Sequence, residues 1–403
     1  MNPSPLIIEP TDGIPPGRRR CEAAERKGLG HPDSICDAVM ERISLALCRE
    51  YLNVFGRVLH HNVDKGLLVA GRTSPRLGGG EVLEPMRLVL GDRATYEYEG
   101  KRVDVAGIAE AEARIWFTIH LPHLDPERHL IFQNELKPGS PELVDIFAKQ
   151  AWCANDTSAA VGYAPLTETE SLVLEAEKYL NGQEFKRLFP EAGEDVKVMG
   201  YRQDQRLDLT VAVAFVDRFV PSGRAYFARK EEMRRTLLDF LRGRLRRLQE
   251  VSVSLNTLDD PNRGEAGMYL TVLGTSAEGG DCGAVGRGNP VNGVISLHRP
   301  RGAEAAAGKN PVSHVGKIYS LFAHHLADRM HRDIPGLEEV TVSLGSQIGR
   351  TISDPAMASI QLSIAKDARR EDVEPAIREI YEREIRGLDA FVQKLVSGIF
   401  PIC

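Results

Sequence analysis

Apolar residues repeat every four positions after residue 33, at Ile35, Val39, Ile43 and Leu47. This spacing predicts a helix over 33–52 with one buried face. The same criteria predict further helices over 105–114, 228–248, 312–332 and 370–397, and strands over 57–62, 67–70, 86–90, 115–119, 208–219, 250–255, 268–273 and 340–344. Strands and helices mix without strict alternation, which predicts an α+β fold of several sheets, each covered by helices.

Composition restricts the class of protein. The 403 residues are 42% hydrophobic and 27% charged, as in an ordinary globular protein with a large core. The net charge of −6 gives no reason to expect a nucleic-acid or membrane partner, and we interpret the basic segment 228–248 as the solvated face of a helix. No apolar run approaches the roughly 18 residues that span a bilayer, and no signal peptide is visible. The six cysteines show no CxxC spacing, so we expect a cytoplasmic protein without disulfides or structural zinc.

The segment Gly30-His31-Pro32-Asp33 opens the first predicted helix. Pro32 suits a first helical turn, because its missing N–H has no partner there in any case. The free N–H groups of a helix N-terminus favour anions, and Asp33 could hold Mg²⁺ shared with a phosphate. A polyphosphate site is one interpretation of this segment, and a plain helix cap is the other.

Three further segments carry candidate chemistry. Residues 274–289 are too glycine-rich for a helix and contain Asp281 and Arg287, which suit a metal and a phosphate. Lys309 lies in a turn before a predicted helix, and Asp156 lies in an acidic turn before small residues. Each has an ordinary alternative: a surface loop, a solvated lysine and a turn cap. The chain has neither a GxxxxGK[ST] loop nor a GxGxxG fingerprint, so the common nucleotide-binding folds are not supported.

Together these segments resemble the S-adenosylmethionine synthetase family. The matching motifs are His-Pro-Asp at 31–33, Asn-Asp-Thr-Ser…Gly-Tyr-Ala at 155–164, Gly-Asp-x-Gly-x-x-Gly-Arg at 280–287 and Gly-Lys-Asn-Pro at 308–311. The flanking sequences Glu-Arg-Lys-Gly-Leu-Gly, His-His-Asn, Gly-Thr-Ser-Ala-Glu and His-Val-Gly-Lys-Ile-Tyr are similar to its archaeal-type branch. The resemblance extends from about residue 22 to beyond residue 350.

The resemblance implies a methionine adenosyltransferase. In that reaction the sulfur of L-methionine attacks the ribose C5′ of ATP and displaces the triphosphate. The products are S-adenosylmethionine, phosphate and diphosphate, because the triphosphate is then hydrolysed. Such an enzyme must align the reacting atoms and neutralise the charge that develops on the triphosphate. The resemblance also implies two Mg²⁺ per site and allows a K⁺ site.

The resemblance assigns charged residues to the triphosphate and its metals. His31 would hydrogen-bond the departing triphosphate near its bridging oxygen. Arg287 and Lys309 would bind the polyphosphate and support its hydrolysis, and Asp33 and Asp281 would each bind one Mg²⁺.

Other residues are assigned to the substrates and to K⁺. In Asp195-Val196-Lys197, Asp195 would lie near the nucleotide and Lys197 on a phosphate. Glu81 would lie near the methionine amino group, and Asp156 in the pocket for nucleotide and methionine. Asp64 stands where a K⁺ carboxylate ligand is expected.

The chain departs from the family pattern at several positions. The bacterial–eukaryotic branch has lysines where this chain has Ser34 and Gly288, so other groups must help to neutralise the triphosphate. His314 and Lys317 are candidates. The departures from the archaeal pattern are Cys282, Pro290 and Lys65-Gly66-Leu67.

The implied fold is a single unit of three similar, interleaved α+β subdomains about a pseudo-threefold axis. Approximate segments are 22–135, 136–255 and 256–403. Two chains would form a homodimer through their sheet faces, with active sites at the interface. Ser140-Pro141-Glu142, which the sequence predicts to cap a helix, resembles a loop that closes over the substrates.

Two rival functions stay open from sequence alone. One is a non-catalytic homologue that binds nucleotide, although such a protein would not need the full set of charged residues. The other is a different ATP-using enzyme, such as a kinase or ligase. Product analysis separates them, because a kinase releases ADP and a ligase AMP or ADP.

Overall fold

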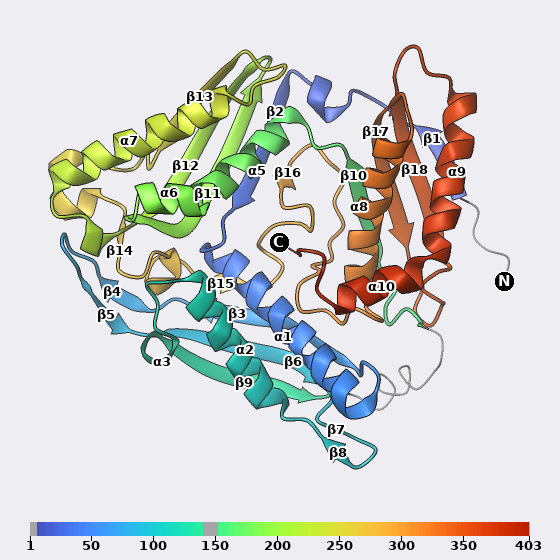
Figure 1. Cartoon of the computed structure of the whole chain (residues 1–403), viewed down its shortest axis with the longest axis horizontal. Helices are drawn as coiled ribbons and strands as arrows, with labels where there is room; N and C mark the ends of the chain where they lie inside the picture. The colour runs from blue at the N-terminus through green and yellow to red at the C-terminus, as the bar shows by residue number, and fades with distance from the viewer. Residues whose placement is uncertain (1–5, 140–151, 403) are drawn as a thin grey trace.

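Three mixed β-sheets with packed helices form the chain (Figure 1). The computed structural model describes residues 6–139 and 152–402. The α+β prediction is confirmed.

The first sheet is built around the N-terminal third of the chain. Its strand order is β15 (Gly283–Ala284), β3 (His61–Val69), β6 (Met86–Ala94), β9 (Leu130–Pro138). Its helices are α1 (Pro32–Phe55), α2 (Val105–His120) and the short α3 (Pro126–His129). Two small hairpins extend from it, β4 (Arg72–Ser74) with β5 (Glu81–Glu84), and β7 (Glu97–Tyr98) with β8 (Lys101–Arg102).

The second sheet is built mainly from the middle of the chain. Its order is β13 (Glu250–Leu255), β12 (Arg206–Val216), β11 (Ala192–Gln203), β2 (Cys21–Lys27), β16 (Ile295–Ser296), and β14 (Leu270–Thr271) also pairs with β12. Its helices are α5 (Glu168–Leu180), α6 (Gln183–Leu188) and α7 (Gly223–Arg242).

The third sheet joins the two ends of the described chain. Its order is β1 (Leu6–Pro10), β18 (Met357–Ile364), β17 (Leu337–Gly345), β10 (Ala159–Ala164). It packs against α8 (Val315–Asp333), α9 (Arg370–Arg386) and α10 (Leu388–Val396).

The same order of elements recurs in each sheet. A helix precedes an antiparallel hairpin, and a second helix follows it: α1, β3–β6 and α2; α5, β11–β12 and α7; α8, β17–β18 and α9. The second hairpin strand then pairs in parallel with β9, β13 or β1. The first hairpin strand pairs with a strand from elsewhere in the chain: β15, β2 or β10. Strand pairing therefore crosses each of the approximate segment limits expected from sequence.

Helix α1 positions the site and matches its prediction. His31 is its N-cap and Pro32 its first residue, and it ends before Gly56, whose φ of 71° is left-handed. Ile35, Val39 and Ile43 are fully buried in the core beneath the first sheet. A well-packed helix thus holds His31 and Asp33 at its N-terminus in fixed positions.

Several other predicted elements are wrong. Residues 115–119 belong to α2, because Trp116 and Phe117 continue the helical spacing of buried Ala109 and Ala113, and tertiary packing overrides β-propensity. Helix α7 ends at Arg242 rather than 248. The predicted helix over 370–397 is two helices, which divide at Gly387.

Among the strands, 57–62 and 67–70 merge into β3, which begins only at His61, and 268–273 shrinks to β14. The sequence analysis missed β11 as a strand, although it carries two of the predicted site residues.

Candidate functional site

His31 caps helix α1 and presents a defined imidazole tautomer. Its Nδ1 accepts a hydrogen bond from the backbone N–H of Asp33 at 3.2 Å. Burial is the main cause that lowers the pKa of His31, although the nearby Asp195 and Asp33 oppose it. The neutral ring therefore carries its proton on Nε2, where it can donate to a ligand oxygen.

Two carboxylates on α1 hold the glycine-rich loop. Asp33 Oδ1 accepts the N–H of Ala284 at 3.0 Å, and Asp33 Oδ2 contacts the Lys27 ammonium at 2.9 Å. One turn later, Asp37 accepts the N–H groups of Gly286 at 2.7 Å and Gly288 at 3.1 Å. Burial raises the pKa of Asp37 to about 7. These contacts fix the backbone on both sides of Arg287.

Arg287 itself lies at the surface of that loop, with an exposed side chain. The loop thus places the backbone of Arg287 near the N-terminus of α1, and its side chain is open to solvent.

A second acidic group faces His31 from β11. The buried Asp195 accepts hydrogen bonds from the backbone N–H of Ser276 at 2.8 Å and from its hydroxyl at 2.5 Å. Burial raises the pKa of Asp195, the charge of Asp281 acts in the same direction, and His31 opposes it. His31, Asp195 and Asp281 therefore share one electrostatic environment.

Lys197 belongs to the same region. It lies two residues along β11 from Asp195, and its charge contributes to the lowered pKa of His31. Its ammonium lies 3.2 Å from Glu25 Oε1, and its side chain is 44% exposed. The lysine can therefore turn to a ligand at little cost.

Asp64 and Lys309 form a separate, buried ion pair. The carboxylate of Asp64 contacts the ammonium groups of Lys309 and Lys65 and the amide of Asn62. Burial opposes ionisation of Asp64, but the contacts with Lys309, Lys65 and Asp92 together hold the pKa of that carboxyl below its usual range. Lys309 also lies 3.4 Å from Glu304. A predicted K⁺ ligand and a predicted phosphate ligand are thus partners in this structure.

Two predicted residues in the described part of the chain, Glu81 and Asp156, lie apart from both groups. Glu81 is exposed on β5, with Arg76 at 3.8 Å. Asp156 accepts the N–H of Thr157 before β10, in the third sheet. Ser140 lies outside the described residues. Among the described residues, no hydrogen bond or ion pair joins Glu81 or Asp156 to the other predicted residues.

His314 and Lys317, the two candidates to replace the missing lysines, are both buried and hold other positions in the structure. Burial lowers the pKa of His314 to about 3, so this N-cap of α8 is neutral. The Lys317 ammonium is buried against Glu41, at 2.7 and 2.9 Å from its two oxygens. Neither is free to neutralise a polyphosphate.

Three residues that were not predicted from sequence complete these groups: Lys27 on Asp33, Ser276 on Asp195 and Glu304 on Lys309. Lys27 could have been noticed, because it lies in the Glu-Arg-Lys-Gly-Leu-Gly segment, four residues before His31. Ser276 belongs to the Gly-Thr-Ser-Ala-Glu segment of the resemblance, but nothing in the sequence indicates its pairing with Asp195. Glu304 gives no sequence signal, since it meets Lys309 through folding.

The two carboxylates predicted as Mg²⁺ ligands do not belong to a closed cage of protein ligands in the described part of the chain. Residues 6–139 and 152–402 contain no group of three or more His, Cys, Asp or Glu side chains that could hold a metal ion. Mg²⁺ is often held by one or two carboxylates together with substrate phosphates. Asp33 and the exposed Asp281 are single carboxylates of that kind.

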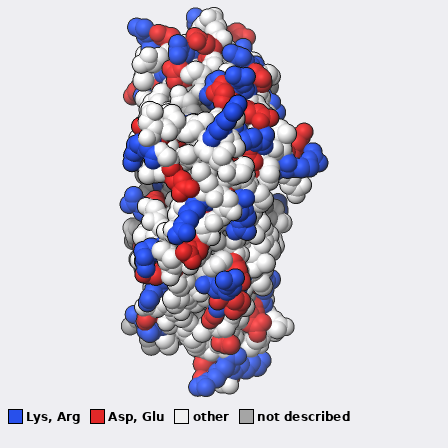
Figure 2. Space-filling view, turned by 90° about the vertical axis from the view of Figure 1, so that its left-hand side faces the viewer, with Lys and Arg blue, Asp and Glu red and all other residues white. Residues whose placement is uncertain are grey.

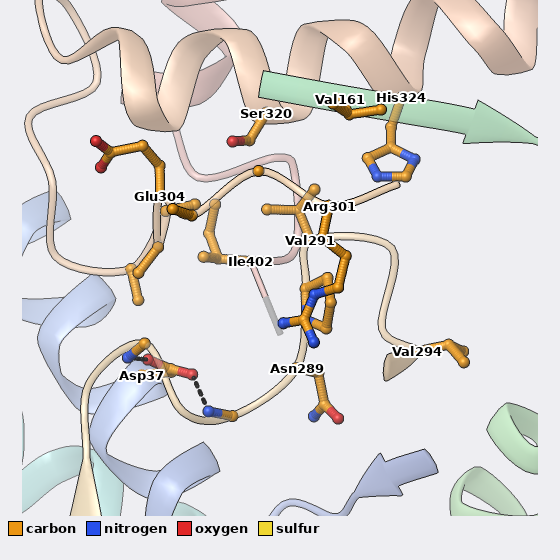
Figure 3. Close-up of a pocket in the computed structure, with 18 of the residues that line it drawn as sticks. Asp37, Val161, Asn289, Val291, Val294, Arg301, Glu304, Ser320, His324 and Ile402 are labelled. Carbon is orange, nitrogen blue, oxygen red and sulfur yellow. Dashed lines mark hydrogen bonds between the residues drawn. The ribbon is translucent and has the colours of Figure 1, made fainter. Parts of the chain in front are cut away.

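A cavity of about 90 Å³ lies beside the glycine-rich loop (Figure 3). Asp37 and the loop residues Gly286 and Gly288 form one wall, and Arg301 and His324 project from the other side. None of the predicted site residues in the described part of the chain lines it. The cavity therefore adjoins the loop that carries Arg287 rather than containing the site.

Comparison with known proteins identifies the family. Residues 5–399 match the S-adenosylmethionine synthetase (AdoMet synthetase) family. The chain belongs to the S-adenosylmethionine synthetase family. It is 42% identical to a probable S-adenosylmethionine synthase of Aquifex aeolicus over 98% of this chain and 99% of that protein. It is 46% identical to the S-adenosylmethionine synthase of Aeropyrum pernix over 94% of each chain.

The fold comparison agrees with this assignment. An S-adenosylmethionine synthetase from Campylobacter jejuni, described as unusual, superimposes with a TM-score of 0.59 at 14% identity, over 92% of this chain and 89% of that one. The resemblance inferred from sequence is confirmed, and so is the prediction that the chain is an enzyme of the methionine adenosyltransferase class. None of the helices in the described part of the chain is long and apolar enough to cross a membrane.

Proposed function

We propose that the chain forms S-adenosylmethionine from ATP and L-methionine by attack of sulfur on the ribose C5′, and then hydrolyses the displaced triphosphate to phosphate and diphosphate. The supporting observation is the convergence of His31, Asp33, Asp195 and Asp281 from separate segments at the N-terminus of α1. Lys197 and the Arg287 loop add positive charge to the same region.

In this proposal His31 acts as a neutral donor. Its Nε2–H hydrogen-bonds the triphosphate near the bridging oxygen, where negative charge develops as the C5′–O bond breaks. Lys197, Arg287 and Lys309 bind the polyphosphate. Lys309 must exchange at least part of its pairing with Asp64 for a phosphate, which an ammonium on a flexible stem can do.

Asp33 and Asp281 would each hold one Mg²⁺. Bound Mg²⁺ supplies charge neutralisation for the triphosphate. The role of Asp64 as a K⁺ ligand stays a prediction. K⁺ would have to compete for its carboxylate with the ammonium groups of Lys65 and Lys309.

The separation of Glu81 and Asp156 from the main group favours a homodimer with sites at its interface. The outer face of the first sheet presents Leu67 and Ile131, which are 42% and 41% exposed, and half-buried Val89 between them. We propose that two chains pack through such sheet faces, and that the recurring topology reflects a pseudo-threefold arrangement. Glu81, Asp156 and the Ser140 loop would then serve methionine and nucleotide, in the cytoplasm.

The direct test is incubation with ATP, L-methionine, Mg²⁺ and K⁺, followed by chromatography. Equal amounts of S-adenosylmethionine, phosphate and diphosphate, dependent on both substrates, support the proposal. Release of ADP or AMP favours a kinase or ligase. ATP binding by a folded protein without any of these products favours a non-catalytic homologue.

A further inference from the structure

Lys27 has a backbone that is held by hydrogen bonds and an ammonium group that reaches the proposed site. It is the last residue of β2, and Asn289 clamps its backbone: the N–H of Lys27 donates to Asn289 Oδ1 at 3.0 Å, and Asn289 Nδ2 donates to the Lys27 carbonyl at 2.8 Å. The Ser34 hydroxyl donates to the same carbonyl at 3.2 Å. The stem of Lys27 is therefore aimed at the N-terminus of α1.

The ammonium joins the two parts of the site that carry opposite charges. It donates to Asp33 Oδ2 at 2.9 Å and to the carbonyl of Arg287 at 2.5 Å. Its charge also contributes to the lowered pKa of His31. An ammonium has three N–H donors, and in the described part of the chain these two contacts use two of them. One donor is left for a ligand, and 13% of the side chain is exposed.

The surroundings of Lys27 suit an anion. The N-terminus of α1 contributes partial positive charge, and the exposed Arg287 side chain begins next to the carbonyl that Lys27 binds. The position beside Lys27 on the helix is Ser34, which brings no charge, and Gly288 has no side chain. Lys27 is thus the side-chain cation in contact with Asp33 among the described residues.

We propose that Lys27 is a polyphosphate-binding residue, whose ammonium passes from Asp33 to an anionic oxygen of the polyphosphate when Asp33 takes a cation. This inference rests on the proposed function and extends it to a residue of the Glu-Arg-Lys-Gly-Leu-Gly segment to which the resemblance assigned no role. A cation on Asp33 weakens the pairing with Lys27, and the polyphosphate that arrives with it offers a stronger partner. The alternative role is a structural clamp that only ties the Arg287 loop to α1.

The test measures binding of inorganic tripolyphosphate by calorimetry, with and without Mg²⁺. Lys27→Met keeps the length of the stem and removes the charge. Lys101→Met is the matched control, because Lys101 is exposed on β8 and its ammonium contacts only the Val54 carbonyl in the described structure. We expect Lys27→Met to weaken tripolyphosphate binding by about tenfold or more and Lys101→Met to leave it unchanged, since charge-assisted contacts to phosphate are strong.

Two charge-retaining variants separate ligand binding from a structural clamp. Lys27→Arg restores a cation at the same position, and Lys27→Met with Ser34→Lys moves it to the neighbouring position on α1. Recovery of tripolyphosphate binding in either variant supports the proposal. Binding by Lys27→Met equal to wild type overturns it, as does a loss that neither charge-bearing variant repairs.

A wild-type measurement covers the case in which Lys27→Met does not fold. The ¹³Cε resonance of Lys27, assigned from its absence in Lys27→Arg, should shift on addition of tripolyphosphate, while that of Lys101 should not. A Lys27 resonance that does not respond overturns the inference. Because these readouts need no turnover, they are independent of the proposed function: Lys27-dependent binding without S-adenosylmethionine formation refutes the reaction alone.

Discussion

At the scale of single residues, burial and pairing decide what each charged group can do. His31 is neutral because it is buried, and its tautomer is set by the Asp33 N–H. The ammonium group of Lys317 is paired with Glu41 in a buried contact. The side chain of Lys197, in contrast, is 44% exposed. A list of charged residues in motifs therefore does not show which of them can reach a substrate.

Asp281→Asn should abolish or strongly reduce turnover and leave the fold intact. The side chain is exposed, and its contact within the described structure is to the N–H of Cys282, so little packing is lost. We expect a decrease in kcat on the order of 100-fold or more, the scale for losing one electrostatic contact to a transition state. Kinetics and thermal unfolding should be measured beside Asp389→Asn, an exposed aspartate on α10. Wild-type activity in Asp281→Asn would remove Asp281 from the metal site.

Glu278 should make stability fall as the pH rises. Burial raises the pKa of Glu278 from 4.5 to about 7, although it accepts hydrogen bonds from the N–H groups of Val272 and Leu273 and from the Thr73 hydroxyl. Between these two pH values the folded state binds more protons than the unfolded state, so the free energy of unfolding decreases with increasing pH across that window.

Urea unfolding of wild type and Glu278→Gln from pH 4.5 to 8 checks this linkage. The wild type should lose stability relative to the variant as the pH rises to about 7, and the difference should then level off. A difference that is constant with pH would show that folding does not raise the pKa of Glu278.

At the scale of elements, hydrogen bonds between α1 and the glycine-rich loop hold the two main parts of the site together. Asp33 and Asp37, one turn apart, receive N–H groups from Ala284, Gly286 and Gly288. The helix was predictable from its four-residue apolar period and its proline. The loop was recognisable as non-helical from its glycines, but its docking on α1 joins residues about 250 positions apart, as the Asp37–Gly286 separation of 249 shows.

Gly288→Ala should break this docking. A Cβ at Gly288 would lie 2.2 Å from Asp37 Oδ2, whereas one at Gly243 meets nothing closer than 3.6 Å. We expect Gly288→Ala to destabilise the fold by about 1–3 kcal/mol, the usual cost of forcing extra atoms into a packed site, and to lower activity. Denaturant unfolding and kinetics beside Gly243→Ala test this; equal behaviour of the two variants would contradict the docking role of the loop.

At the scale of the whole molecule, three sheets repeat one topology and exchange strands. The exchanged strands β2, β10 and β15 each lie beside a hairpin from a different part of the chain. Motifs at 31–33, 280–287 and 195–197 are brought together by this interleaving. Charges of both signs are interspersed on the face shown in Figure 2, so that face offers no apolar patch for association.

Leu67→Asp should convert the expected dimer to monomer. Leu67 is 42% exposed on the outer face of the first sheet, and a carboxylate buried there without a partner is costly. Ile119→Asp is the matched control, because Ile119 is 60% exposed on α2, a helix on the other side of that sheet. Sedimentation velocity should show a dimer for wild type and Ile119→Asp. A monomeric wild type, or a dimeric Leu67→Asp variant, would contradict the proposed interface.

The sequence by itself determined the α+β class, helix α1 and the identity of the family. These follow from local periodicity and from short motifs, both of which are written in consecutive residues. Only the tertiary structure decided that 115–119 is helical, because packing of Trp116 and Phe117 overrides their local preference. It also decided the pairing of Lys27 with Asp33, of Ser276 with Asp195 and of Lys309 with Asp64. Two of these pairs join residues that are distant in the chain, and all three depend on burial, which no short segment of sequence encodes.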